Sequence, residues 1–171
     1  YHKVHESKNA LHYAELSLRI QPNNPLALIQ YAKALTINNE LEKAIGLLEK
    51  LNENFPDNDD IKYDLSTAYR EMGEFKKANK LSTDVFKKDY KNTSYLLGYI
   101  KDKENRLNEK HINFYNEKLE SEDLNLEDKI LINYSFFEYF RNQNDYQRAG
   151  SHLIKSNDAQ YAHKEFDIES E

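Results

Sequence analysis

A small residue recurs along the chain at a fixed interval. Ala10, Ala44 and Ala78 are spaced 34 residues apart, a period that is typical of stacked helical repeats. The residues around each alanine repeat as well: Ala14, Ser17 and Pro22 in the first copy, Leu41, Leu48, Leu51 and Pro56 in the second, and Phe75, Ser82, Val85 and Tyr90 in the third. A small side chain lets a second helix approach closely, apolar residues four and seven positions later continue the same face, and proline ends the unit. The spacing therefore predicts a stack of antiparallel helix pairs.

The composition agrees with an all-α fold. The chain has 171 residues, 39% of them hydrophobic and 32% charged, with only 4 Gly and 3 Pro, which suits helices joined by short polar turns. It contains no Cys, which excludes a disulfide scaffold, a zinc–thiolate site and a cysteine nucleophile. This is compatible with the cytoplasm, where we expect the protein to reside.

The charge pattern limits the classes of partner. The formal net charge is −6, and lysines are interleaved with Asp and Glu, unlike the basic stripe of a nucleic-acid binder. No apolar run approaches the roughly 18 to 20 residues of a membrane span, and no signal peptide opens the chain. We therefore expect neither nucleic acid nor a membrane as partner. The start at Tyr1 and the ending "DIESE" suggest a piece of a longer protein.

The first helix of each expected pair shows a matching apolar face. Leu28, Tyr31, Ala32 and Leu35 form it in one unit, and Leu65, Ser66 and Tyr69 form it in the next. The turns "NNE" and "MGE" separate each first helix from its partner. Period, Ala, Tyr and Pro together resemble the tetratricopeptide repeat family over residues 1 to about 90. The resemblance implies a right-handed α-solenoid of antiparallel helix pairs.

A fourth alanine anchor, Ala149, lies 71 residues after Ala78, which leaves room for one irregular unit between them. That unit lacks the alanine anchor and a turn glycine, and its helices are expected over 93–103 and 108–121. The predicted division is 1–22 as the end of a preceding repeat with a lone helix, units at 23–56 and 57–90, a degenerate helix pair at 91–124, a repeat-like unit at 125–160 and an exit segment at 161–171.

Residues 92–160 carry a narrower resemblance. Glu127, Asp128 and Lys129, then Tyr134, then Asp145 through Ala149, and finally Ser156 with Asn157 resemble the segment that precedes the catalytic domain of bacterial tetratricopeptide-containing sulfotransferases. Phe136, Phe137 and Tyr139 depart from that pattern, where the family has small residues. The resemblance implies a parent enzyme that transfers a sulfuryl group from phosphoadenosine phosphosulfate. An unrelated tetratricopeptide protein remains the alternative.

Candidate chemical groups favour structural roles. In the sulfotransferase family, binding of the sulfuryl donor needs a glycine-rich phosphate loop. The glycines here stand isolated in helical patterns, so no cofactor and no catalytic residue are predicted. His2, His5 and His12 share a helical spacing, but no general base accompanies them, so no metal is predicted. We expect His111, His152 and His163 at the surface or half-buried. The pairs Asp59 with Asp60 and Glu122 with Asp123 are expected at helix starts, where they complement the helix dipole.

A partner-binding groove is the remaining candidate site. In this fold the first helix of each pair lines the concave surface, where the register places Ile29, Lys33, Tyr63, Thr67, Arg70, Lys101, Tyr134, Glu138 and Arg141. A mixed aromatic and basic groove could hold an extended peptide, and a solvated face is the alternative. Some tetratricopeptide modules clamp the C-terminal carboxylate of heat-shock chaperones with basic and amide side chains. Among the positions of this chain that correspond to those side chains, only Lys33 is basic, and Asp64 would repel a carboxylate, so we do not expect that function.

We therefore expect a non-catalytic protein-interaction scaffold. Its partner would be a protein or peptide, including an adjoining sulfotransferase-like catalytic domain or a second copy of the chain. A free-standing adaptor that binds a peptide in its groove and an enzyme in its own right are the competing functions.

Overall fold

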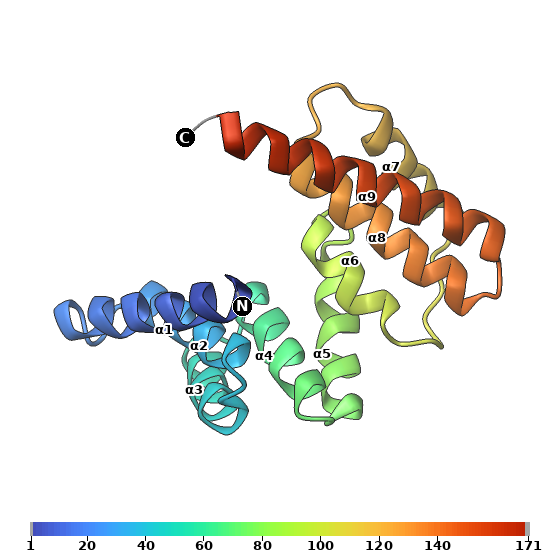
Figure 1. The fold of residues 1–171 in the computed structure, drawn as a ribbon. Coiled ribbons are helices and arrows are strands. Elements are labelled where there is room, and N and C mark those ends of the chain that lie inside the picture. Colours follow the sequence, from blue (N-terminus) through green and yellow to red (C-terminus); the bar gives the residue numbers. More distant parts are fainter. Residues whose placement is uncertain (1, 170–171) are drawn as a thin grey trace. The chain divides into compact units, whose positions relative to one another are not determined.

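The computed structural model describes the backbone of residues 2–169 and the side chains of residues 9–162. Within this part the chain forms helices joined by turns, without strands (Figure 1). The helices group into two compact units, residues 1–85 and 86–171, which are described separately below. The predicted all-α fold is confirmed.

The first unit contains helices that pack on one another in chain order. These are α1 (His2–Ile20), α2 (Pro25–Ile37), α3 (Leu41–Asn54), α4 (Asp59–Glu71) and most of α5 (Phe75–Lys88). The first helix of each pair starts at an asparagine cap. Asn24 Oδ1 accepts a hydrogen bond from the amide of Leu26 at 2.9 Å, and Asn58 Oδ1 accepts one from Ile61 at 3.1 Å. Such caps satisfy amide groups that the first helical turn leaves unpaired.

The turn inside each helix pair has the same backbone geometry. Asn39 has φ 62°, Gly73 has φ 88° and Asn144 has φ 60°, the left-handed conformation that Gly and Asn adopt most readily. The amide that follows each of them donates to the carbonyl five residues earlier, as from Glu74 to Tyr69 at 2.8 Å. This Schellman-type closure ends the first helix and starts the second.

Three of the four alanine anchors, Ala44, Ala78 and Ala149, are buried as expected, whereas Ala10 is exposed. Ala44 and Ala78 have no exposed surface, and Ala78 belongs to a buried cluster with Leu65, Ala68 and Tyr69 of α4. The remaining members of that cluster are Ile29, Ala32, Leu48, Leu51 and Ile61. The small residues thus allow the close helix contacts that the period predicted.

The second unit is built around α8 (Leu126–Asn142). α6 (Thr93–Ile100), α7 (Glu109–Glu120) and α9 (Tyr146–Glu169) each contact it, and α8 and α9 lie side by side (Figure 1). Its interior is rich in aromatic rings. The edge of one ring meets the face of the next at 6.1 Å between the centroids of Tyr115 and Phe136, a favoured aromatic geometry.

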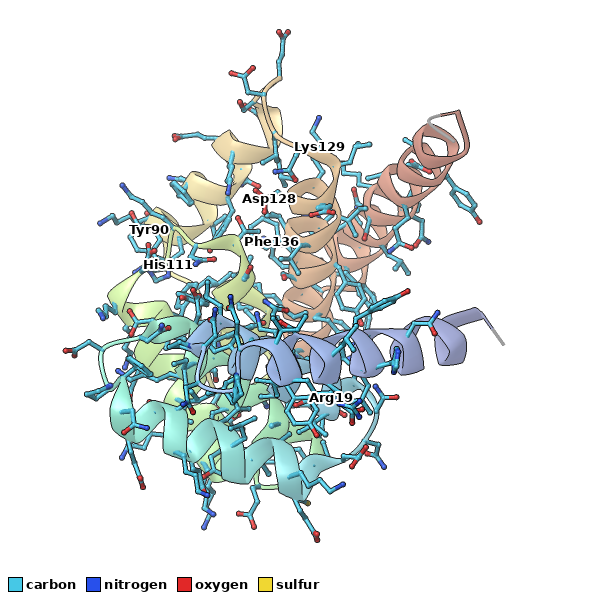
Figure 2. All side chains as sticks on the ribbon, turned by 90° about the vertical axis from the view of Figure 1, so that its left-hand side faces the viewer. Arg19, Tyr90, His111, Asp128, Lys129 and Phe136 are labelled. Carbon is cyan, nitrogen blue, oxygen red and sulfur yellow. The ribbon has the colours of Figure 1, made fainter. Side chains whose placement is uncertain are left out.

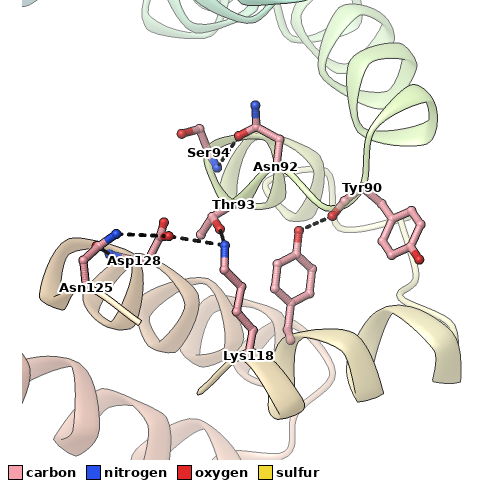
Figure 3. A network of polar contacts seen from close by, with 8 residues as sticks. Tyr90, Asn92, Thr93, Ser94, Lys118, Asn125 and Asp128 are labelled. Atoms are coloured by element: carbon pink, nitrogen blue, oxygen red, sulfur yellow. Dashed lines mark hydrogen bonds and ion pairs between the residues drawn. The ribbon is translucent and has the colours of Figure 1, made fainter. Parts of the chain in front are cut away.

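Polar contacts fasten α7 within this unit (Figure 3). The ammonium group of Lys118 donates to Thr93 Oγ1 at 2.6 Å and lies 3.3 Å from Asp128 Oδ2. The hydroxyl of the fully buried Tyr115 donates to the carbonyl of Tyr90. The irregular helix pair therefore has specific anchors in place of the missing alanine.

Three sequence-based expectations differ from the structure. The helix expected over 93–103 ends at Ile100, because side chains in the following segment bond to the backbone instead, as Asn105 Nδ2 does to the carbonyl of Tyr99 at 2.8 Å. α9 continues through the expected exit segment to Glu169, since no Gly or Pro follows Gly150. Glu122 and Asp123 lie in the turn before α8, whose cap is Asn125, and not at its start.

Candidate partner-binding surface

The first helices of two successive pairs enclose a hollow in the first unit. Lys33, Thr36 and Ile37 of α2 face Tyr63, Asp64 and Thr67 of α4, and these six side chains line a cavity of about 290 Å³. We call it the α2–α4 hollow. Three of the predicted groove residues, Lys33, Tyr63 and Thr67, come together here.

An ion pair crosses the α2–α4 hollow. Lys33 Nζ lies 3.4 Å from Asp64 Oδ2, with the lysine more exposed than the carboxylate. Burial raises the pKa of Asp64 to about 6, while Lys33 opposes the increase and Asp60 adds to it. Lys33 therefore stabilises a carboxylate that water reaches poorly. The pair lowers the net charge of the hollow, which is less basic than the sequence suggested.

The two threonine hydroxyls of the α2–α4 hollow bond to the backbone of their own helices. Thr36 Oγ1 donates to the carbonyl of Ala32 at 3.0 Å, and Thr67 Oγ1 donates to that of Tyr63 at 3.2 Å. Burial raises the pKa of the Tyr63 phenol, and Asp64 acts in the same direction. Tyr63 is thus a neutral ring at physiological pH, set beside the ion pair.

Two other predicted groove residues of the first unit have different environments. Arg70 Nη2 lies 3.5 Å from Ser82 Oγ of α5. Ile29 is buried in the core cluster, so its assignment to an open groove is corrected. It shares a helix face with Lys33, but its short apolar side chain is covered by neighbouring helices, whereas the long lysine reaches outward.

The last four predicted residues lie in the second unit. Lys101 is exposed and caps the end of α6, outside the helix that was expected to present it. Tyr134, Glu138 and Arg141 lie on α8 and, with Phe137, form a surface cluster that we call the α8 patch. Arg141 pairs with Glu138 and its guanidinium lies 5.3 Å from the centre of the Phe137 ring. The Tyr134 and Phe137 rings are 5.8 Å apart.

Part of this geometry was not predicted from the sequence. Thr36 and Ile37 were not expected at the site, although Ile37 lies one helical turn beyond Lys33 and extending that face would have found it. Asp64 was expected only to repel carboxylates, because its distance from Lys33 cannot be read from the sequence. Phe137 was considered only as a packing residue.

Two histidines of the second unit, His111 and His152, have packing roles. His152 Nδ1 lies 2.9 Å from Asn133 Oδ1, and its ring stacks on Phe140 with centroids 5.6 Å apart. Burial lowers the pKa of His152 to about 4, with Lys155 and Arg148 contributing. His111 lies beside Tyr90, and burial also lowers its pKa (Figure 2). Both rings are half-buried, as predicted.

The described residues also bear on metal binding and on membrane insertion. The side chains of His2, His5 and His163 lie outside the described residues, and His12 is exposed. Among the described residues, no three His, Cys, Asp or Glu side chains gather as a metal site would require. In the part of the chain that the structure describes, every helix is too short or too polar to cross a membrane.

The helix pairs, buried alanines and left-handed turns define the tetratricopeptide-type class of helical-repeat folds. Residues 35–97 match the sequence model of the tetratricopeptide repeat family. Such repeats are generally non-catalytic and serve protein–protein interaction. No curated protein matches the chain.

Solved structures show the same fold. "MamA 41-end from Desulfovibrio magneticus RS-1" has a TM-score of 0.53 at 15% identity, covering 91% of this chain and 86% of that one. "MamA RS-1 ArsTM double mutant" has a TM-score of 0.52 at 15% identity, covering 92% and 86%. At this identity the similarity concerns the fold alone.

Proposed function

We propose that the protein is a non-catalytic interaction scaffold and that the α2–α4 hollow holds a segment of a partner protein. The observation that carries the proposal is the placement of Lys33, Tyr63 and Asp64 around one cavity between the first helices of successive pairs. An aromatic ring gives contact area at little cost in conformational entropy, while the ion pair offers both a donor and an acceptor.

The chemistry of the α2–α4 hollow favours a peptide that carries both apolar and polar side chains. Ile37 and the Tyr63 ring supply apolar surface, and Ile37 is exposed to solvent. Because Asp64 already pairs with Lys33, a partner that brings only negative charge would have to compete with that carboxylate. A segment with an apolar anchor next to a polar or zwitterionic pair fits better than an acidic tail.

A displayed library of random 16-residue peptides, selected against the whole chain, tests the proposal. Selected peptides should shift the amide resonances of residues 33–37 and 63–67 in nuclear magnetic resonance spectra. They should lose binding to the Tyr63→Ala chain and keep it for Lys50→Ala, an exposed change on α3. Peptides whose shifts map elsewhere, or whose binding ignores Tyr63→Ala, would contradict the proposal.

A narrower proposal concerns the parent protein. From the sequence resemblance over residues 92–160, we propose that the scaffold adjoins a sulfotransferase-like catalytic domain, which it would serve by holding an acceptor or by self-association. Two motif residues also have local roles that need no such domain. Asp128 pairs with Lys118, and Asp145 accepts hydrogen bonds from the amide and side chain of Arg148 at 3.0 and 2.6 Å.

The full reading frame of the gene decides whether the parent protein is a sulfotransferase-like enzyme or a free-standing adaptor. A downstream strand followed by a glycine-rich phosphate loop supports the sulfotransferase proposal, and a stop codon directly after Glu171 supports the free-standing adaptor.

A further inference from the structure

The second helices of two successive pairs, α3 and α5, line another hollow in the first unit together with α4. It has a volume of about 450 Å³. We call it the α3–α5 hollow, and its polar lining residues are Glu49, Asn52 and Glu53 of α3, Tyr69 of α4, and Lys77 and Lys80 of α5. None of these residues lines the α2–α4 hollow, so the two hollows are separate features of the unit.

The two walls of the α3–α5 hollow differ in chemical character. Glu49, Asn52 and Glu53 place oxygen acceptors on the α3 wall, and the ammonium groups of Lys77 and Lys80 are donors on the α5 wall. The two glutamates and the two lysines are exposed to solvent. Because the charges of the walls balance, a ligand with charge of one sign only would meet repulsion from one wall.

Tyr69 of α4 connects the two walls. Its hydroxyl donates to a carboxylate oxygen of Glu49, and the Lys77 ammonium group lies 5.0 Å from the centre of its ring. The Tyr69 side chain is 8% exposed, and Leu65, one turn earlier on the same helix, is 3% exposed. Burial raises the pKa of the Tyr69 phenol to about 12, and Glu49 acts in the same direction, so the hydroxyl remains a donor. An aromatic and apolar base thus joins the acceptors of α3 to the donors of α5.

Asn52 has a buried oxygen without a donor. No group of the described residues donates to Asn52 Oδ1, which is shielded from solvent. A buried acceptor of this kind is costly unless an N–H or O–H group reaches it. The positions one period earlier and one period later hold Leu18 and Phe86, so an apolar side chain suits this position of the repeat. The polar side chain of Asn52 therefore indicates a ligand that supplies a donor.

The preceding pair has a hollow at equivalent positions, but that hollow lacks two of these groups. Its volume is about 390 Å³, and its lining includes Leu35 and Gly46. One period later these positions hold Tyr69 and Lys80. Helix packing explains why a hollow recurs, but it does not explain the added hydroxyl and ammonium groups.

The length of the α3–α5 hollow limits its occupant to about one residue. The lining residues fall within 49–53, 65–69 and 77–81, and five residues of an α-helix rise by roughly 6 Å. A hollow of this length is too short to seat the face of another helix, but it holds one long side chain. The occupant must then place donors on the α3 wall and an anionic group on the α5 wall.

A guanidinium group suits the α3 wall. Its N–H donors form a planar fork that can serve several oxygens at once, and its plane can stack on an aromatic ring. A carboxylate suits the α5 wall, because it accepts hydrogen bonds from ammonium groups. The apolar stem of an arginine joins these two groups and can pack on Leu65 and Tyr69.

We propose that the α3–α5 hollow binds an arginine that carries a free carboxylate. The guanidinium donates to Asn52 Oδ1 and Glu53, the stem packs on Tyr69, and the carboxylate accepts hydrogen bonds from Lys80. Free L-arginine and the carboxyl-terminal arginine of a protein share this chemistry. The site is independent of the α2–α4 hollow, and it adds recognition of a defined ligand to the scaffold.

Titration calorimetry with the whole chain tests the proposal. The small probes are free L-arginine, agmatine, which lacks the carboxylate, and L-citrulline, which has a neutral urea group in place of the guanidinium. A short peptide that ends in arginine is used with a free and with an amidated carboxyl terminus. At least one probe that carries both groups should bind about tenfold or more tightly than its counterparts that lack one of them. In nuclear magnetic resonance spectra its binding should shift the amide resonances of residues 49–53 and 77–81.

Matched substitutions locate the site. Asn52→Leu introduces the side chain found at Leu18, so it removes the acceptor while preserving an apolar contact, and we expect binding to weaken by about tenfold or more. Lys80→Ala should also weaken binding, whereas Lys76→Ala, at another exposed lysine of α5, should leave it unchanged. Tyr63→Ala changes the α2–α4 hollow and should have no effect. Circular dichroism of each variant separates lost binding from lost folding.

The two sources of the ligand give different results. Binding of free L-arginine alone would assign the site to a small molecule, and binding of the free-carboxylate peptide alone would assign it to a protein terminus, and both results support the proposal. Failure of both probes to bind at millimolar concentration would overturn it. So would equal affinity for agmatine and L-arginine, or binding that is unchanged by both Asn52→Leu and Lys80→Ala.

Discussion

Lys33 on α2 and Asp64 on α4 form an ion pair with 3.4 Å between Nζ and Oδ2. The two residues belong to the first helices of successive pairs, and they lie 31 positions apart in the sequence. Their contact connects the packing of the repeats with the surface proposed to bind a partner.

The Asp64 carboxyl should make stability fall as pH rises. Burial raises its pKa from 3.8 to about 6, so between these values the folded state binds more protons than the unfolded state. Its contribution is fully present below pH 3.8 and is lost as pH rises through about 6. Urea unfolding of Asp64→Asn and the unmodified chain from pH 4 to 7 should show the variant gaining relative stability at higher pH. Asp57→Asn, an exposed change, serves as control, and a pH-independent difference for Asp64→Asn would contradict the assignment.

His152 should have the opposite effect. Because burial lowers its pKa from 6.5 to about 4, the unfolded state binds the proton more readily in this range. The contribution is complete above pH 6.5 and is lost as pH falls toward 4. We expect the imidazole resonances of His152 to titrate well below pH 6.5 in nuclear magnetic resonance spectra. A titration midpoint for His152 near 6.5 would show that the ring is solvated.

The buried anchors Ala44 and Ala78 should tolerate no large side chain. Ala44 and Ala78 have no exposed surface, so Ala44→Trp or Ala78→Trp should destabilise the first unit by about 1 to 3 kcal/mol through overpacking. Lys50→Trp and Lys87→Trp, at exposed positions, should change the free energy of unfolding by under about 0.5 kcal/mol. Similar denaturation midpoints for the two sets would mean that the repeat register is wrong.

The hydroxyl of Tyr115 should stabilise the irregular helix pair. It is fully buried and donates to the carbonyl of Tyr90, which is half-buried, so Tyr115→Phe removes one hydrogen bond at a cost of about 1 kcal/mol. Tyr161→Phe removes an exposed hydroxyl and should be neutral in the same urea titration. A neutral Tyr115→Phe would indicate that water replaces the lost donor.

The periodic features of the fold could be predicted from the sequence because they depend on local rules. Ala44 and Ala78 mark close contacts, and Asn39 and Gly73 mark turns that need a positive φ. These signals recur at one period, so each copy supports the reading of the next. The irregular unit offers no second copy, and there the expected helix extended beyond Ile100.

The candidate site was harder to predict because it depends on distances between helices. The sequence placed Ile29 and Lys33 on one face of a helix, but it could not show that one is buried and the other reaches the α2–α4 hollow. Nor could it show that Asp64 neutralises Lys33. Burial also differs between equivalent positions, because Ala10 is exposed whereas Ala44 has no exposed surface.

The most direct test of the central claim is titration calorimetry with the strongest library-selected peptide. The double variant Lys33→Ala with Tyr63→Ala changes the α2–α4 hollow, and Lys50→Ala with Glu53→Ala changes exposed charges of α3. We expect a loss of roughly 2 kcal/mol or more in binding free energy for the first pair and under about 0.5 kcal/mol for the second. Equal losses from the two double variants would contradict this expectation and leave the unit as a structural spacer.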